Sequence, residues 1–276
     1  MDISNLETPA AIVDLDKLQA NITKLQKYLD RHGIANRPHI KTHKIPEIAH
    51  MQLKAGATGI TCQKLGEAEV MAQAGIDNIF LPYNILGKSK LERLMRLARR
   101  LTIKVTADSQ VVVQGLAQAA QKEALILPVL VEFDTGLGRC GVQTPQATAD
   151  LAAFIAQTPG LRFGGLMTYP SNEQTGSFVR RTKERLQTAG IHVDVVSGGG
   201  TPRMWQAHTH TEVSEHRAGT YVYGDRAIVR SGAMSFDDCA FSVICTVVSR
   251  PTAVRGIIDG GSKTFSSDLS GLEGHG

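Results

Sequence analysis

Short apolar, β-branched runs alternate with amphipathic stretches along most of this chain, at a repeat of roughly 20–30 residues. Strands that alternate with helices predict parallel strands joined by right-handed crossovers. Eight such units predict an α/β fold of the closed (β/α)8 or TIM-barrel type, and a doubly wound open sheet is the alternative. The predicted strands are Ala35–Lys41, Gly59–Cys62, Asn78–Pro82, Ile103–Thr106, Leu125–Phe133, Arg162–Thr168, His192–Ser197 and Glu212–Arg217.

The clearest helical pattern directly follows residue 14. Apolar side chains recur there every three or four residues, which places them on one face of a helix. Asp14 or Asp16 is positioned to cap the first turn, and Ser109 and Thr144 are good starts for two later helices. The apolar face consists of Leu15, Leu18, Ile22, Leu25 and Leu29.

The pattern changes after Arg226. Ala240–Ser249 and Val254–Asp259 have the composition of strands, with no helix between them. We therefore predict a barrel over residues 1–225 and the start of a small C-terminal β domain over residues 226–276. This β segment is too short to close a core of its own, so we expect the domain to be incomplete and the sequence to be truncated.

Charge and apolar pattern exclude several classes of protein. The 30 basic and 26 acidic residues give a net charge of +4, too small and too evenly spread to predict a nucleic-acid partner. No apolar run approaches the ~20 residues of a membrane span, and the first residues do not resemble a secretory signal, so no membrane partner is expected. The cysteines form no C-x-x-C pair, which favours reduced thiols in a cytoplasmic protein; they are Cys62, Cys140, Cys239 and Cys245.

The segment Arg37–Lys44 contains the most informative lysine. If the strand continues through it, His39, Lys41 and His43 share one face, and Lys41 points into the top of the barrel. Burial would lower the pKa of this lysine and make it a better nucleophile toward an aldehyde. The alternative is a solvated loop of basic residues.

The segment Ser197–Thr201 reads Ser-Gly-Gly-Gly-Thr and follows the seventh predicted strand. Three glycines let backbone N–H groups approach an anion, and the flanking hydroxyls add donors. A short helix that begins near Thr201 would direct its positive end to the same point. Because phosphate often binds late in the strand order of a barrel, we predict a phosphate site here rather than a simple glycine turn.

Other polar residues also follow predicted strands. Arg139 lies in a glycine-rich turn after the fifth strand, where it serves a pocket, forms a salt bridge with Asp134, or does both. Tyr169 ends the sixth strand and either binds a ring or substrate or is a rim aromatic. Further along, His208 and His210 would share a strand face with Glu212 as a metal site, although a polar loop is the stronger interpretation.

Strand alternation would also place two tyrosines, Tyr221 and Tyr223, on one face beside the predicted phosphate loop. One of them would cap the phosphate and the other would pack.

Together these motifs resemble the D-threonine aldolase / eukaryotic-type D-serine dehydratase family, whose alanine racemase-like barrel belongs to the fold type III enzymes of pyridoxal 5′-phosphate (PLP). The segments RPHIKTHK, VEFDTGLGRCGV, SGGGTP and EHRAGTYVYGD match in the expected order, and the resemblance runs from Thr8 to Asp268. It implies that Lys41, not Lys44, is the Schiff-base lysine. It also implies a cofactor ring bordered by Gln63, Arg139 and Tyr169, and a phosphate bound by Ser197, Gly199, Gly200, Thr201 and Tyr221.

Members of this family continue through a His-x-Asp or His-x-Cys pair that binds a divalent metal. No such pair follows Asp268, and the late His275 is followed directly by glycine. By resemblance the intact enzyme would bind Mn²⁺, Mg²⁺ or Zn²⁺, with ligands that this chain does not contain.

The resemblance implies a PLP-dependent lyase that acts on D-β-hydroxy amino acids. We expect retro-aldol cleavage of D-threonine-like substrates to glycine and an aldehyde, with D-serine dehydratase chemistry as the alternative. An amino-acid racemase, a non-catalytic PLP-binding protein and a phosphate-substrate barrel without PLP stay open. A homodimer is expected by resemblance.

Overall fold

The computed structural model describes residues 5–266. The chain forms two compact units: residues 22–219, and the described residues within 1–21 and 220–276. The predicted boundary after residue 225 stays a prediction, and His275 lies outside the described residues.

The larger unit is built on eight parallel strands in the order β2-β9-β8-β7-β6-β5-β4-β3. The two ends of this sheet meet, because His39 forms a parallel bridge with Thr61 and the Thr61 N–H donates to the Pro38 carbonyl at 2.8 Å. The (β/α)8 prediction is thus confirmed, and each predicted run overlaps one strand. The strands are β2 (Ala35–Asn36), β3 (Ile60–Thr61), β4 (Asn78–Leu81), β5 (Thr102–Ala107), β6 (Leu127–Glu132), β7 (Leu161–Met167), β8 (Val196–Gly198) and β9 (Glu215–His216).

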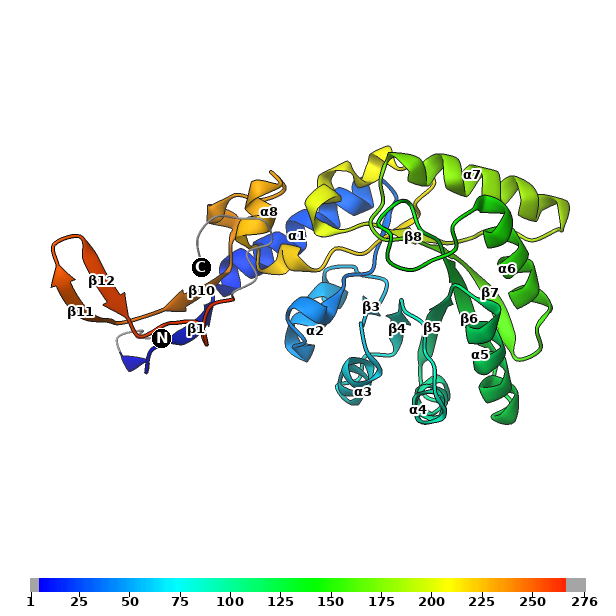
Figure 1. Ribbon diagram of the computed structural model, residues 1–276, viewed down its shortest axis with the longest axis horizontal. Helices are drawn as coiled ribbons and strands as arrows, with labels where there is room; N and C mark the ends of the chain where they lie inside the picture. The colour runs from blue at the N-terminus through cyan, green and yellow to red at the C-terminus, as the bar shows by residue number, and fades with distance from the viewer. Residues whose placement is uncertain (1–4, 267–276) are drawn as a thin grey trace. The chain divides into compact units, whose positions relative to one another are not determined.

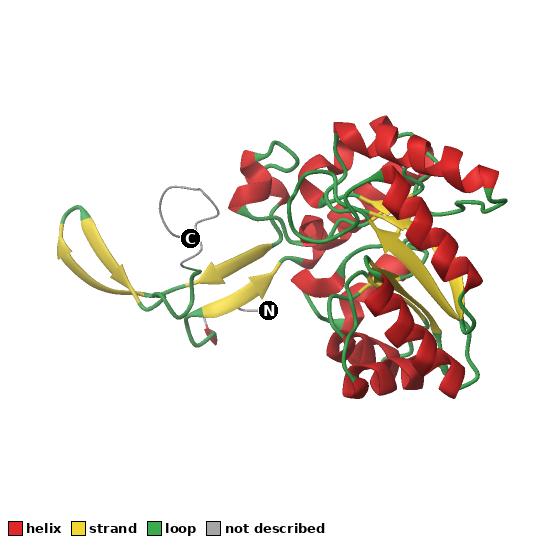
Figure 2. Ribbon diagram, turned by 45° about the vertical axis from the view of Figure 1, so that its right-hand side comes forward, coloured by secondary structure: helices red, strands yellow, loops and turns green. Residues whose placement is uncertain are grey.

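Helices follow the barrel strands and surround them (Figures 1 and 2). The Asp14 carboxylate accepts from the Asp16 and Lys17 N–H groups, and the Thr144 hydroxyl accepts from the Ala147 N–H, as predicted. Ser109 precedes the helix Gln110–Lys122 as predicted, but its side chain forms no cap hydrogen bond. The helices are α1 (Leu15–Arg31), α2 (Pro46–Lys54), α3 (Leu65–Gln73), α4 (Lys88–Ala98), α5 (Gln110–Lys122), α6 (Pro145–Gln157) and α7 (Glu173–Thr188).

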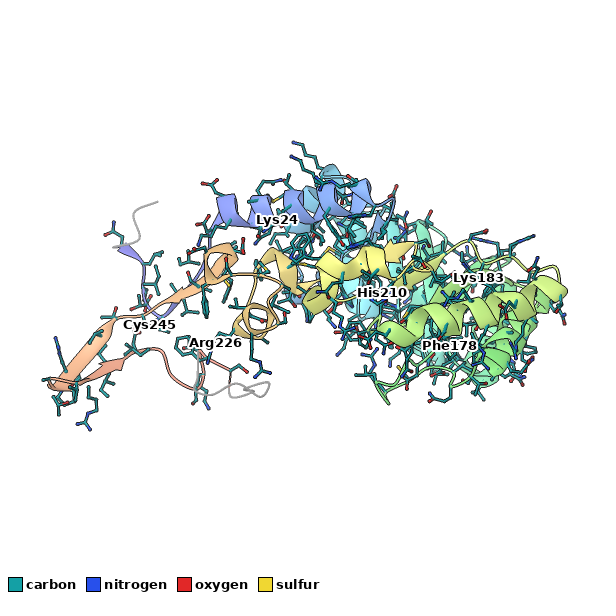
Figure 3. All side chains as sticks on the ribbon, turned by 90° about the horizontal axis from the view of Figure 1, so that it is seen from above. Lys24, Phe178, Lys183, His210, Arg226 and Cys245 are labelled. Carbon is teal, nitrogen blue, oxygen red and sulfur yellow. The ribbon has the colours of Figure 1, made fainter. Side chains whose placement is uncertain are left out.

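Helix α7 illustrates how this outer layer is held. Phe178 of α7 stacks on Phe133, which directly follows β6, with ring centroids 4.5 Å apart. Lys183 of the same helix donates to the Glu212 carboxylate at 2.7 Å; both α7 residues are labelled in Figure 3. Apolar packing therefore fixes the inner face of α7, and an ion pair ties it to the segment before β9.

The barrel interior combines one apolar layer with a buried charge network. Phe80, Leu130 and Met167 form the apolar cluster. Glu215 of β9 accepts from Arg37 Nε at 2.6 Å and lies 3.4 Å from Lys104 Nζ. Burial raises the pKa of Glu215, but the charges of Arg37 and Lys104 and the hydrogen bonds from Arg37 and Ser197 lower it below its ordinary value overall.

The smaller unit contains two antiparallel strand pairs. β1 (Ala10–Val13) pairs with β10 (Phe241–Ile244), and β11 (Val247–Thr252) pairs with β12 (Arg255–Ile258). Sequence analysis missed β1, because four apolar residues do not distinguish a strand from the start of α1. The predicted strand Ala240–Ser249 is two strands, β10 and β11. The unit also contains the short helix α8 (Arg226–Arg230) and the 3₁₀ turns η4 (Thr220–Val222) and η5 (Phe236–Asp238).

Replacing Glu215 tests the interior network. Glu215→Ala leaves two buried cations uncompensated, so we expect the free energy of unfolding to fall by about 3–5 kcal/mol in urea denaturation. The control is Glu69→Ala, which breaks a half-exposed ion pair with Arg93 between α3 and α4 and should cost no more than about 1 kcal/mol. An equal decrease in the free energy of unfolding of the two variants would contradict a stabilising role for the buried charge network.

Candidate active site

Lys41 lies at the carboxyl end of β2, but not on a continuing strand. The chain turns after His39 into a 3₁₀ helix, η2 (Ile40–Thr42), and the His39 Nδ1 accepts from the Lys41 N–H at 3.3 Å. The prediction of a shared strand face is therefore wrong, because this local hydrogen bond ends the alternation. As a result Ile40 is buried and the Lys41 side chain is accessible to solvent.

The surroundings of Lys41 nevertheless disfavour its positive charge. Desolvation lowers the pKa of Lys41, and the Arg139 and Arg217 guanidinium groups lower it further. Its Nζ lies 5.7 Å from the centroid of the Tyr169 ring, and Arg139 Cζ lies 5.3 Å from the same centroid. The structure thus brings together three residues of the predicted site around one aromatic ring: Lys41, Arg139 and Tyr169.

Gln63 is linked to this group of residues by a contact with His39. Its Oε1 lies 3.2 Å from His39 Nε2, directly beside the turn that carries Lys41. Burial, together with the charges of Lys41 and Arg217, lowers the pKa of His39 to about 3, which keeps the imidazole neutral at physiological pH.

The predicted phosphate loop follows β8, and its glycines are required by close packing. A Cβ on Gly199 would lie 2.4 Å from His216 Nδ1, and one on Gly200 would lie 3.2 Å from the Tyr169 ring. Both residues have positive φ, +105° and +156°. Thr201 begins the 3₁₀ helix η3 (Thr201–Thr209). The loop is thus a tight glycine turn directly beside Tyr169, called the glycine cradle below. Its role toward phosphate stays a prediction.

The two hydroxyl groups that flank the glycines have partners within the fold. Ser197 donates to the Glu215 carboxylate at 2.5 Å and accepts from Arg217 at 2.6 Å, inside the barrel. The Thr201 hydroxyl accepts from the Gly219 N–H at 3.2 Å. In this structure the Ser197 hydroxyl proton is therefore engaged with Glu215, and the predicted role of Ser197 toward phosphate stays a prediction.

Two predicted alternatives are also corrected. Asp134 does not pair with Arg139; its carboxylate accepts from the backbone N–H groups of residues 136–138, which shapes the glycine turn. Arg139 instead lies 3.6 Å from Glu132. His208 and His210 lie in and just after η3 rather than on a strand, and His208 Nδ1 lies 2.5 Å from the Tyr28 hydroxyl.

No group of three or more His, Cys, Asp or Glu side chains that could hold a metal occurs within residues 5–266. The metal implied by the resemblance therefore stays a prediction.

Tyr221 belongs to the smaller unit, where it is buried in η4. The prediction that Tyr221 and Tyr223 share one strand face is wrong, because residues 220–222 form a 3₁₀ helix instead of a strand. The predicted role of Tyr221 toward phosphate stays a prediction.

Sequence reasoning assigned no role to Arg217 or Glu132, which both act beside the predicted residues. Arg217 immediately follows β9 and donates to the Thr168 carbonyl at 2.8 Å as well as to Ser197. The sequence did carry one signal for both residues, because each is a charged residue at the carboxyl end of a predicted barrel strand. Only the closed barrel shows that the Arg217 charge acts on Lys41 and that Glu132 lies near Arg139.

The described residues form a (β/α)8 barrel that carries Lys41, whose pKa is lowered, and a glycine-rich loop at the carboxyl ends of its strands. Residues 13–227 match the family described as "Alanine racemase, N-terminal domain", and the chain belongs to this family. In the part of the chain that the structure describes, no helix is long and apolar enough to cross a membrane.

Three similar proteins are informative. D-threonine aldolase of Arthrobacter sp. is 34% identical over 96% of this chain and 74% of its own length. D-threo-3-hydroxyaspartate dehydratase of Delftia sp. is 34% identical over 95% of this chain and 73% of its own. The crystal structure of D-threonine aldolase from Filomicrobium marinum superposes with a TM-score of 0.90 at 31% identity, over 96% of this chain and 76% of that one. The predicted family resemblance is confirmed.

Buried imidazoles predict sensitivity to acid. Burial lowers the pKa of His43 and of His216 to about 4, and that of His39 to about 3. Below about pH 6.5 the histidines of the unfolded chain bind protons, whereas the buried histidines of the folded chain do not until the pH reaches their lowered pKa values. The free energy of unfolding is therefore highest above about pH 6.5 and falls as the pH decreases. We expect a slope approaching about 1.4 kcal/mol per pH unit for each histidine.

Urea denaturation as a function of pH measures this slope. His43→Gln should reduce it, and His50→Gln, on the exposed side of α2, controls for the loss of an imidazole. Stability independent of pH over this range would contradict the burial.

Proposed function

We propose that this chain is a PLP-dependent lyase of D-β-hydroxy amino acids, which cleaves D-threonine-like substrates to glycine and an aldehyde. The observation that carries the proposal is the position of Lys41, with its lowered pKa, beside the Tyr169 ring and near the glycine cradle. The similarity to D-threonine aldolases of Arthrobacter and Filomicrobium supports the substrate class.

The residues present fit PLP. The cradle at Gly199 and Gly200 has no room for side chains and would receive the phosphate, and the cations Lys41, Arg139 and Arg217 favour an anionic group at this mouth. Bound PLP supplies an aldehyde that reacts with amines and a ring that accepts the electron pair released at Cα.

Each residue of the site has a role that follows from its surroundings. A lowered pKa increases the neutral, nucleophilic fraction of the Lys41 amine, so Lys41 would hold the cofactor and later accept or donate a proton at Nζ. Arg139 keeps its charge and, with Tyr169 and Gln63, would border the ring. The neutral His39 orients Gln63 without adding a charge.

A divalent metal, Mn²⁺, Mg²⁺ or Zn²⁺, belongs to this proposal by family resemblance alone. No cluster of three or more candidate ligands occurs within the described residues. A homodimer is likewise proposed from the resemblance, and a cytoplasmic location is proposed from the cysteine pattern.

Dehydration is the second candidate function, because the Delftia relative is a dehydratase at 34% identity. Product analysis with D-threonine, D-serine and D-3-hydroxyaspartate separates the reactions, with and without added metal. Glycine plus an aldehyde supports the aldolase, whereas ammonia plus a keto acid supports the dehydratase. An L-amino acid product indicates a racemase, and PLP binding without turnover indicates a binding protein.

Lys41→Ala tests the cofactor lysine. We expect the visible absorption of bound PLP to disappear, and borohydride reduction followed by peptide mapping to place the pyridoxyl group on Lys41 of the wild type. The neighbouring Lys44→Ala is the matched control, because this side chain is largely exposed and pairs with Glu67. A wild-type chain that shows no such absorption with PLP added would refute the proposal.

Gly199→Ala tests the cradle. The new Cβ would approach His216 and must displace the loop, so we expect the affinity for PLP to fall at least about tenfold in an absorbance titration. The control Gly190→Ala is also at a positive φ, +68°, but its Cβ meets no atom within 4 Å, so it should leave the affinity unchanged. Equal affinity in both variants would place the phosphate elsewhere.

A further inference from the structure

Glu132 is a buried carboxylate at the mouth of the barrel that the proposed function does not yet use. It is the last residue of β6, opposite Met167 of β7, and its side chain is 2% exposed. Strand alternation places it on the same face as Leu130, which belongs to the interior cluster with Met167. Its carboxylate therefore lies inside the barrel, at the carboxyl end of the strand.

One carboxylate oxygen of Glu132 holds two consecutive residues of the glycine turn. Oε1 accepts from the Cys140 thiol at 3.1 Å and lies 3.6 Å from Arg139 Nη2. Oε2 is buried and has no hydrogen-bond partner among the described residues. A buried carboxylate with an unpartnered oxygen costs free energy, so contribution to stability does not explain its presence.

Arg139 needs such a partner to keep its position. Its side chain is 51% exposed and is anchored by the ion pair with Glu132 and by the Tyr169 ring, whose centroid lies 5.3 Å from Cζ. The other acid of the turn, Asp134, is committed to three backbone N–H groups. Without Glu132, the guanidinium would lose its only ionic anchor within residues 5–266 and could rotate toward solvent.

We propose that Glu132 is a positioning residue, which holds the Arg139 guanidinium over the Tyr169 ring and thereby at the cofactor ring. This inference rests on the proposed function. Glu132 acts through Arg139 and does not itself touch substrate or cofactor. Its removal should therefore change turnover only while Arg139 is present.

A double-mutant cycle tests this dependence, with Glu132→Gln and Arg139→Gln measured singly and together in the PLP-loaded enzyme. We expect Glu132→Gln to lower kcat about tenfold, with KM changed less than about twofold, because a misplaced group near the reacting atoms lowers turnover. In the Arg139→Gln background the same change should lower kcat less than about twofold.

An equal fold-loss in both backgrounds, or no loss in the first, would overturn the proposal. Glu69→Gln is the matched control for the loss of one carboxylate, because Glu69 pairs with Arg93 on the outer helices.

A second measurement needs neither PLP nor turnover. Burial raises the pKa of the Cys140 thiol, and the adjacent Glu132 raises it further. Glu132→Gln should therefore increase the rate of Cys140 alkylation by iodoacetamide about tenfold near neutral pH, measured by mass spectrometry of the Cys140 peptide. An unchanged rate would show that the carboxylate does not lie at this turn, and would overturn the proposal.

The two measurements separate the possible failures. A wild type that binds no PLP refutes the proposed function, while the alkylation rate still decides where Glu132 lies. A wild type that turns over, combined with an additive cycle, refutes only the positioning role.

Discussion

Inside the barrel, Glu215 accepts hydrogen bonds from Arg37 and Ser197 and lies 3.4 Å from Lys104. Each cation would be costly to bury alone, and a single carboxylate compensates both. Arg217 extends the network by donating to Ser197 at 2.6 Å. Ser197 of β8 is held by Glu215 and Arg217, and β8 leads directly into the glycine cradle. The geometry of the cradle therefore depends on Glu215.

Charge compensation also acts at the mouth of the barrel. Arg139 and Arg217 both lower the pKa of Lys41, so the barrel prepares this lysine through neighbouring cations as well as through desolvation. Glu132 and Glu215 compensate those cations only in part, which leaves the mouth favourable for anions. The proposed site, which would hold a phosphorylated cofactor and a neutral amine, needs both properties.

Much of the fold was predictable because the barrel repeats one simple pattern. All eight predicted runs overlap barrel strands, since an inward and an outward face impose a recognisable composition on each. Strand lengths were less predictable: β2 spans Ala35–Asn36, whereas the predicted run extended to Lys41. β1 was missed because its partner, β10, lies more than 200 residues away in the sequence, and such pairing has no local signal.

The sequence by itself determined the barrel, the lysine segment, the glycine cradle and the family, because each depends on residue type and local order. Only the tertiary structure decided how Lys41 is presented, since a hydrogen bond from its N–H to His39 replaces the strand with a 3₁₀ turn. It alone also decided that Arg139 pairs with Glu132 rather than Asp134 and that the Ser197 proton is engaged with Glu215. The Ser197–Glu215 contact joins the neighbouring strands β8 and β9, so barrel closure sets its distance. The other two contacts depend on how the turns after β2 and β6 fold back, which residue order alone does not show.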